Sequence, residues 1–234
     1  MRWKILLAGF FVAACAAGAG EAQAPTAPVA EPVVTTLASD PAVTRDAAEM
    51  PSGEYTLDPR HTSVTWRIRH WGLAPYTGRF DAESGALNFD AADPARSTVS
   101  VRIPLASIST GLLNQAGERA FDRDISAYLG AEAHPDIVFT STSIEATSAT
   151  TGRIHGELSF NGRTHPVTLE AVFEGGRVIP TSQRPTLGFT ARGIIQRSRW
   201  LEGVPPLHNS ASPGDEVELI ISAEFTRPPA QQAQ

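Results

Sequence analysis

The 234-residue chain has little cysteine, almost no lysine and no apolar run long enough to cross a bilayer. Its single cysteine, Cys15, has no partner in the chain, so a fold stabilised by internal disulfides is excluded. The apolar run from Ile5 to Ala14 is too short for a membrane-spanning helix, which needs about 20 residues. Acidic residues outnumber basic ones by 25 to 19, and Lys4 is the only lysine. This balance gives no support for nucleic-acid binding, which needs a basic patch.

Motifs for catalysis and for cofactor binding are also missing. The chain has no G-x-S-x-G nucleophile elbow, no G-x-x-x-x-G-K phosphate loop and no dinucleotide-binding glycine pattern. None of its six histidines is spaced four residues from another, so the sequence predicts neither a metal site nor a cofactor. We therefore expect a protein that is not an enzyme. A catalytic triad that only the fold assembles stays open.

The chain does have an apolar residue at every second position, in segment after segment. Near the C-terminus, for example, Val217, Leu219 and Ile221 are separated by polar or outward-facing positions. Side chains alternate between the two faces of an extended strand, so each segment has one apolar and one polar face. Such strands bury their apolar faces against one another in a sandwich or a barrel. The predicted strands are 55–58, 63–71, 77–81, 86–90, 98–104, 137–145, 153–160, 163–173, 186–195 and 216–225.

Two stretches between the strands carry local signals of their own. Asn161-Gly162 separates two alternating runs and predicts a two-residue hairpin turn with positive φ. Between Ile108 and Gly130 the alternation stops, and the apolar spacing there predicts short helical segments across a barrel opening or flank.

The N-terminus has the form of an export signal. A short basic start, Met1 to Lys4, precedes the apolar run, as in secretory signal peptides. Val12-Ala13-Ala14-Cys15 resembles the bacterial lipobox, in which the cysteine thiol is lipidated and becomes the mature N-terminus. Ordinary cleavage after Ala17-Gly18-Ala19 is the alternative, and it would discard Cys15. We favour lipidation of Cys15, which would attach the protein to a membrane.

Composition divides the rest of the chain into three parts. Residues 16–52 are rich in Ala, Pro, Thr and Val without periodicity and predict a flexible tether. Residues 53–227 carry the strands and predict one all-β domain, and residues 228–234 predict a disordered polar tail. Removing the signal leaves 17 basic against 25 acidic residues, a net charge of −8.

Several segments, in order along the chain, resemble the YceI-like family of polyisoprenoid-binding proteins. The first is residues 55–80, Y-T-L-D-P-R-H-T-S-V-T-W-R-I-R-H-W-G-L-A-P-Y-T-G-R-F. Others are Ser107 to Gly111, His134 to Thr142, and Gly156-Glu157-Leu158 with Asn161-Gly162. Two departures, around Arg119 to Ile125 and Arg197 to Leu201, fall where loops would shape a cavity mouth. The identity of a ligand therefore carries over less safely than the fold.

The resemblance implies a lipocalin-like fold and a function in the bacterial envelope. The fold would be an elongated antiparallel eight-stranded barrel with short helical segments between strands. The function would be to bind, sequester or transport a long-chain amphiphilic lipid: an isoprenoid, an isoprenoid quinone or a fatty-acid derivative. We expect the protein to be exported to the periplasm of a Gram-negative bacterium and anchored there as a lipoprotein. Whether two barrels pair as a homodimer stays open.

The candidate ligand-binding residues share the inward parity of the predicted strands or lie near a late strand. An inward histidine is more often structural than a ligand contact, and Arg197 would matter if the ligand carries a phosphate. The aromatic and aliphatic side chains could equally pack on one another and leave no cavity. The candidates are Trp66, Ile68, His70, Phe139, Leu158, Phe160, Leu169, Phe189 and Arg197.

Two other functions fit the same sequence. A solid barrel on a tether could bind another envelope protein through its loops. Alternatively, an envelope enzyme could modify a lipid held in the barrel. Replacing Phe189 by a charged residue separates lipid uptake from a loop contact, and an alanine variant of His70 tests for turnover.

Overall fold

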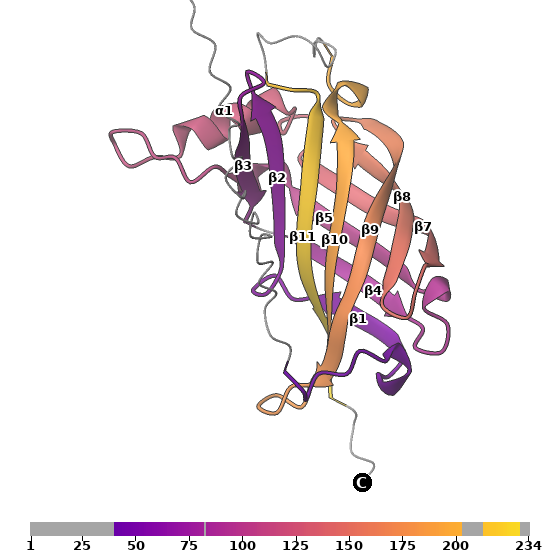
Figure 1. Cartoon of the computed structure of the whole chain (residues 1–234). Helices are drawn as coiled ribbons and strands as arrows, with labels where there is room; N and C mark the ends of the chain where they lie inside the picture. Colours follow the sequence, from indigo (N-terminus) through magenta and orange to yellow (C-terminus); the bar gives the residue numbers. More distant parts are fainter. Residues whose placement is uncertain (1–39, 82, 203–212, 230–234) are drawn as a thin grey trace, which may run out of the picture. The chain divides into compact units, whose positions relative to one another are not determined.

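The structure, a computed structural model, describes residues 40–81, 83–202 and 213–229. The predicted signal, Cys15 and most of the predicted tether lie outside these residues. The described part is mostly strands joined by short connections (Figure 1). The strands are β1 (Gly53–Leu57), β2 (Ser63–His70), β3 (Ala74–Phe80), β4 (Ser84–Phe89), β5 (Thr98–Pro104), β6 (Ile108–Ser109), β7 (Asp136–Ala146), β8 (Thr151–Phe160), β9 (Arg163–Val178), β10 (Pro185–Gln196) and β11 (Glu216–Thr226).

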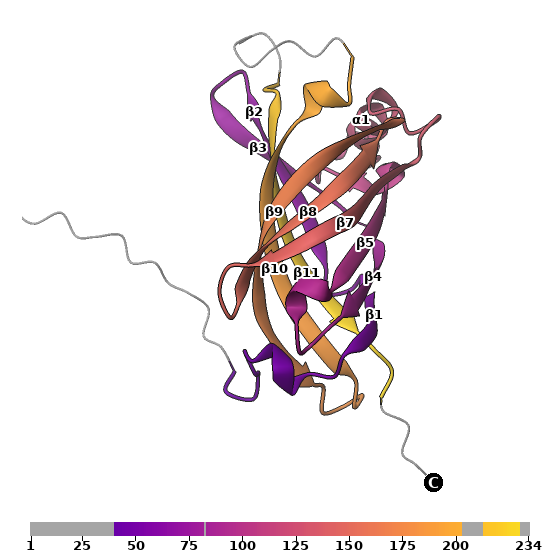
Figure 2. The same cartoon turned by 90° about the vertical axis from the view of Figure 1, so that its right-hand side faces the viewer.

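Eight of these strands close into an antiparallel barrel. The ring runs β1-β4-β5-β7-β8-β9-β10-β11, and β11 returns to β1 through the pairs Thr56–Thr226 and Leu57–Phe225. Strand β2 pairs with the other half of β11, so β1 and β2 follow one edge of β11 in succession. Strands β3 and β6 then extend this side of the sheet. The prediction of an elongated eight-stranded barrel is confirmed (Figure 2).

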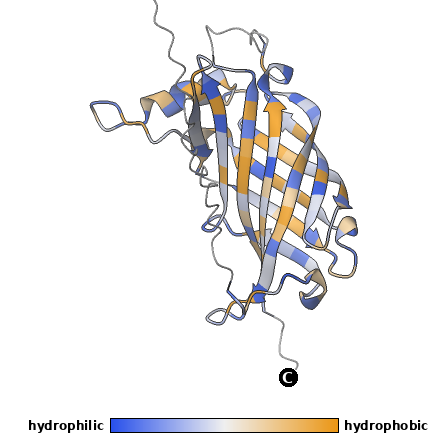
Figure 3. Cartoon of the chain, in the orientation of Figure 1, coloured by the Kyte–Doolittle hydropathy of each residue, from blue (hydrophilic) through white to orange (hydrophobic). Residues whose placement is uncertain are grey.

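The alternation of the sequence orients the strands in this barrel. Apolar and polar residues alternate along the strands in Figure 3, and the apolar ones form the buried clusters of the interior. The turn between β8 and β9 is the predicted hairpin. Asn161 has φ 49° and Gly162 has φ 70°, both in the left-handed region that a two-residue turn of this type needs.

One α-helix, α1 (Ala120–Tyr128), lies in the stretch that was predicted to contain helical segments. It lies at the same end of the barrel as the β2–β3 turn (Figure 1). No helix of the described residues is long and apolar enough to cross a membrane. Short 3-10 turns complete the connections: Ala47–Glu49, Pro94–Arg96, Leu105–Ser107 and Arg197–Arg199.

The prediction of a flexible tether as far as residue 52 is wrong at its C-terminal end. Thr44 forms a bridge with Gly176 of β9, and a 3-10 turn, Ala47–Glu49, follows it. Met50 is only 5% exposed and belongs to a core cluster with Tyr55 of β1. Composition missed this segment because one buried side chain leaves no periodic pattern in the sequence.

The interior contains two separate clusters of buried side chains. The cluster nearer α1 includes Phe80, Leu105 and Trp200. The other includes Tyr55 and Leu187 and lies where β1 closes the barrel. Val101 and Ile221 are only partly buried and pack against both clusters. The space between the two clusters is therefore lined by side chains that other residues cover only in part.

Candidate binding cavity

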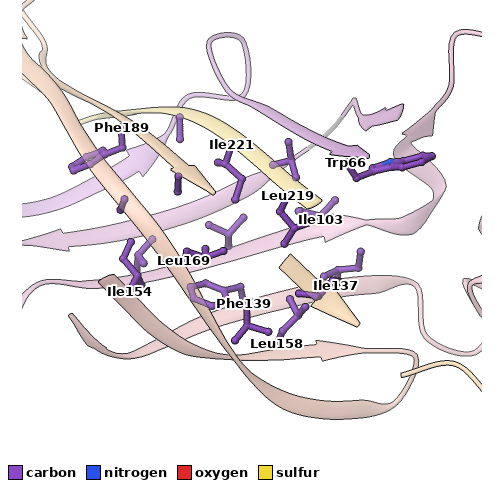
Figure 4. A pocket seen from close by; sticks show the side chains of 18 of the residues that line it. Trp66, Ile103, Ile137, Phe139, Ile154, Leu158, Leu169, Phe189, Leu219 and Ile221 are labelled. Carbon is purple, nitrogen blue, oxygen red and sulfur yellow. The ribbon is translucent and has the colours of Figure 1, made fainter. Parts of the chain in front are cut away.

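A cavity of about 990 Å³ lies inside the barrel, lined by the inward faces of its strands. Ligand sites in proteins have volumes of about 300–1,000 Å³, so this cavity is large enough for an extended molecule. Figure 4 shows side chains from several strands converging on it. Its lining is almost wholly apolar. Among the described lining residues only Arg197 carries a formal charge at neutral pH when histidine is neutral.

Every candidate that the sequence supplied lies on the cavity wall. Parity along the strands correctly placed the apolar ones, because an inward position stays inward for the whole length of a regular strand. Their role as ligand contacts remains a prediction. The lining includes Trp66, Ile68, His70, Phe139, Leu158, Phe160, Leu169, Phe189 and Arg197.

The two ends of the cavity differ in their side chains. Phe189 lies at one end and Trp66 at the other (Figure 4). Around Phe189 the wall is aromatic: its ring centroid lies 5.4 Å from that of Phe173 and 6.1 Å from that of Phe225. Trp66 instead lies 6.1 Å, centroid to centroid, from Tyr76 of β3. Tyr76 was not among the residues predicted from the sequence, although it pairs with Ile68 across β2 and β3 and faces the interior with it.

Exposed apolar side chains lie at the end of the barrel where α1 and the β2–β3 turn lie (Figure 1). Leu112, Phe121 and Tyr128 line the cavity and are also 51%, 46% and 58% exposed. On the β2–β3 turn, Trp71 and Leu73 are 50% and 77% exposed. We call these five residues the apolar rim. Leu112, Phe121 and Tyr128 therefore lie both at the cavity wall and at the protein surface.

His70 and Arg197 both lie at the cavity wall and have contacts of their own. His70 is exposed and makes an edge contact with Trp71. The Arg197 guanidinium donates through Nε to the carbonyl of Gly214 (2.8 Å) and through Nη2 to that of Pro213 (2.6 Å). These two donors hold the segment before β11 in place, and a phosphate-binding role for Arg197 remains a prediction.

His165 is a structural residue. Its Nε2 lies 2.9 Å from the carbonyl oxygen of Arg199, and its ring makes an edge contact with Trp200. Trp200 is fully buried and donates its indole N–H to the carbonyl of Leu158 (3.0 Å). These contacts attach the turn after β10 to the β8–β9 hairpin.

Asp122 of α1 is a buried carboxylate. It is 4% exposed and accepts hydrogen bonds from the backbone N–H (2.9 Å) and the hydroxyl (2.6 Å) of Thr110. The carboxylate fixes α1 to the chain that follows β6. Sequence spacing could not show this, because Thr110 lies outside the helix.

One polar cluster lies at the turn between β1 and β2. His61 Nδ1 lies 2.9 Å from Asp58 Oδ2 and 3.8 Å from Glu224 Oε2 of β11. The hydrogen bond to Asp58, followed by the charges of Glu224 and Asp58, raises the pKa of His61 above its usual value. One ring nitrogen of His61 and one carboxylate oxygen each of Asp58 and Glu224 lie within 4.8 Å of one another. The sequence did not predict this grouping. Ion pairing accounts for this arrangement, since all three residues are wholly or partly exposed.

Together, the closed antiparallel barrel and its apolar interior define a lipocalin-like fold with an internal cavity. The family model of the YceI-like domain matches residues 55–225, so the chain belongs to the YceI-like family.

The chain is also similar to other bacterial proteins in sequence and, for one solved structure, in fold. A UPF0312 protein of Ectopseudomonas mendocina is 36% identical over 178 residues, covering 75% of this chain and 88% of the relative. A UPF0312 protein of Pseudomonas putida is 34% identical over 133 residues. That match covers 55% of this chain and 66% of the relative, slightly under two thirds of its length. Among solved structures, Burkholderia cenocepacia BcnA has 19% identity and a TM-score of 0.61, covering 72% of this chain and 98% of BcnA.

Proposed function

We propose that the protein binds a long-chain amphiphilic lipid inside its barrel and sequesters or transports it without catalysis. The candidate lipids are an isoprenoid, an isoprenoid quinone or a fatty-acid derivative. The observation that carries this proposal is the apolar cavity of about 990 Å³ inside a closed barrel. Each CH₂ group that leaves water contributes about 0.8 kcal/mol, so a long hydrocarbon tail binds without polar recognition.

Two features support a location at the cell envelope. The predicted export signal and Cys15 would place the barrel in the periplasm and attach it to a membrane by a lipid anchor. The apolar rim lies at the end of the cavity where a lipid could enter, and its aromatic residues suit the boundary between membrane and water. Binding of a membrane surface, and pairing of two barrels, remain part of the proposal.

The direct test is extraction of the natively purified protein with organic solvent, followed by mass spectrometry. We expect one lipid with a long prenyl or acyl chain in stoichiometric amount. Protein that is repeatedly recovered empty, and that takes up no added lipid, would remove the proposal.

A matched pair of variants tests the cavity itself. Phe189→Asp places a charge in the apolar wall, whereas Ile194→Asp changes a side chain of the same strand that is 65% exposed. Because a charge in an apolar site is strongly unfavourable, we expect Phe189→Asp to abolish lipid uptake and Ile194→Asp to retain it. Ala171→Trp, which fills the cavity without adding charge, should also block uptake. Uptake that survives both cavity variants, in protein with a native circular dichroism spectrum, would mean that the lipid does not bind in the cavity and would overturn the proposal.

A further inference from the structure

Among the described residues, three side chains of the cavity wall have a buried polar atom without a hydrogen-bond partner. They are the hydroxyl of Thr62, the indole Nε1 of Trp66 and the hydroxyl of Tyr76. All three lie on β2, on β3 or directly before β2, on one side of the barrel. Buried polar atoms are normally paired, so such a group in an otherwise apolar cavity needs an explanation. Trp66 and Tyr76 are the two that lie together.

The position of the Trp66 indole is fixed by a glycine. Trp66 of β2 is paired with Gly78 of β3. A Cβ atom at position 78 would lie only 2.2 Å from Cζ2 of the indole, so the ring occupies the space that any other residue would fill. Tyr76 lies two residues before Gly78 and faces the same interior. The two rings therefore form a preformed pair on the wall.

The chemistry of these two groups defines what they can bind. An indole N–H can only donate a hydrogen bond, so Trp66 is satisfied only by an acceptor. The Tyr76 hydroxyl can donate or accept. Among the described lining residues only Arg197 is charged; its Nε and Nη2 donate to backbone carbonyls, and its Nη1 lies 3.5 Å from the Tyr128 hydroxyl. Neither the indole of Trp66 nor the phenol of Tyr76 is a cation, so the pair offers no counter-charge to an anionic head, whereas a neutral acceptor needs none.

We propose that Trp66 Nε1 and Tyr76 OH bind the polar head of the ligand, and that this head presents an uncharged carbonyl-type oxygen. The inference rests on the proposed function, and it adds an orientation and a ligand class. The head lies on the β2–β3 wall and the hydrocarbon chain runs toward Phe189 at the other end of the cavity (Figure 4).

The test uses three probes with the same number of carbon atoms: pentadecan-2-one, pentadecane and pentadecanoate. Dissociation constants are measured by displacement of a fluorophore from the full-length protein. Trp66→Phe removes the N–H and keeps an aromatic ring, and Tyr76→Phe removes only the hydroxyl. Phe139→Leu changes another lining side chain and serves as the control because it removes no polar atom.

We expect the wild type to bind the ketone more tightly than the alkane. Each hydrogen bond is worth a factor of about five, so each aromatic variant should lose about five-fold in affinity for the ketone. Affinity for pentadecane should stay unchanged in both. In the control variant the ratio of ketone to alkane affinity should equal that of the wild type.

The outcomes separate this inference from the proposed function. If no probe binds any protein, the lipid-binding proposal itself fails. The head-binding role of Trp66 and Tyr76 is overturned if the alkane binds but the ketone binds no more tightly than the alkane. It is also overturned if the ketone keeps the same advantage in affinity over the alkane in both aromatic variants as in the wild type. If pentadecanoate binds more tightly than the ketone, the assignment of an uncharged head is overturned. If Trp66→Phe does not fold, Tyr76→Phe decides the question alone.

Discussion

His61 shows how a single exposed residue gives the barrel a dependence on pH. Its hydrogen bond to Asp58, with the nearby charge of Glu224, raises the pKa of His61 above 6.5. A histidine whose pKa is raised on folding stabilises the protein below its unfolded pKa of about 6.5. That stabilisation is lost as the pH rises through the folded pKa. The contact joins the turn after β1 to β11, so it contributes to barrel closure.

We expect the wild type to melt at a slightly lower temperature at pH about 8.5 than at pH about 5.5 through this contact. The contribution of His61 should not exceed about 3 °C, because exposed ion pairs are weak and screened by solvent. His61→Asn should lack this contribution, so the pH dependence of the two proteins should differ. Thermal melts at both pH values measure it, and identical profiles would show that the pair contributes nothing.

For single residues, the sequence identified which face of a strand a side chain takes but not which groups it contacts. Parity placed Trp66 and Phe189 on the inner face, and both line the cavity. It could not show that Arg197 bonds the carbonyls of Pro213 and Gly214, or that Asp122 is buried beneath Thr110. Those contacts join segments whose approach depends on the closed barrel, and no local pattern encodes them.

At the level of elements, residues 43–52, directly before β1, differ most from the prediction. The sequence predicted that they belong to a flexible tether. Met50 inserts into the cluster at the end of the barrel where β1 closes the ring. Its side chain lies over Gly176 of β9, where a Cβ would be 2.5 Å from Met50 Cγ. Residues 43–52 therefore belong to the barrel.

Met50→Ala should destabilise the protein by about 2–3 kcal/mol, since it removes a buried side chain and leaves a cavity. For a protein of this size that corresponds to a fall in melting temperature of about 6–9 °C. Glu49→Ala, in an exposed neighbour, should change it by less than about 2 °C. Equal melting temperatures for wild type and Met50→Ala would mean that the segment does not pack in solution.

For the whole molecule, an apolar cavity makes stability depend on the bound ligand. A ligand that binds only the folded state, present at about 100 times its dissociation constant, adds about 2.7 kcal/mol. We expect loaded protein to melt about 8 °C above delipidated protein. The Phe189→Asp variant should show no such difference. Differential scanning calorimetry with and without extraction measures both, and a loaded protein that melts no higher than the empty one would contradict binding inside the barrel.

The sequence by itself determined most of the strands, their inward faces, the Asn161-Gly162 turn and the all-β class of the fold. These follow from local rules, because alternation and turn geometry act between residues that are close along the chain. Only the tertiary structure decided whether the inward side chains fill the barrel. Filling depends on barrel radius and on which side chains meet across it, as with Trp66 over Gly78. It also decided the rim, the buried Asp122 and the packing of Met50, because each needs elements from distant parts of the chain.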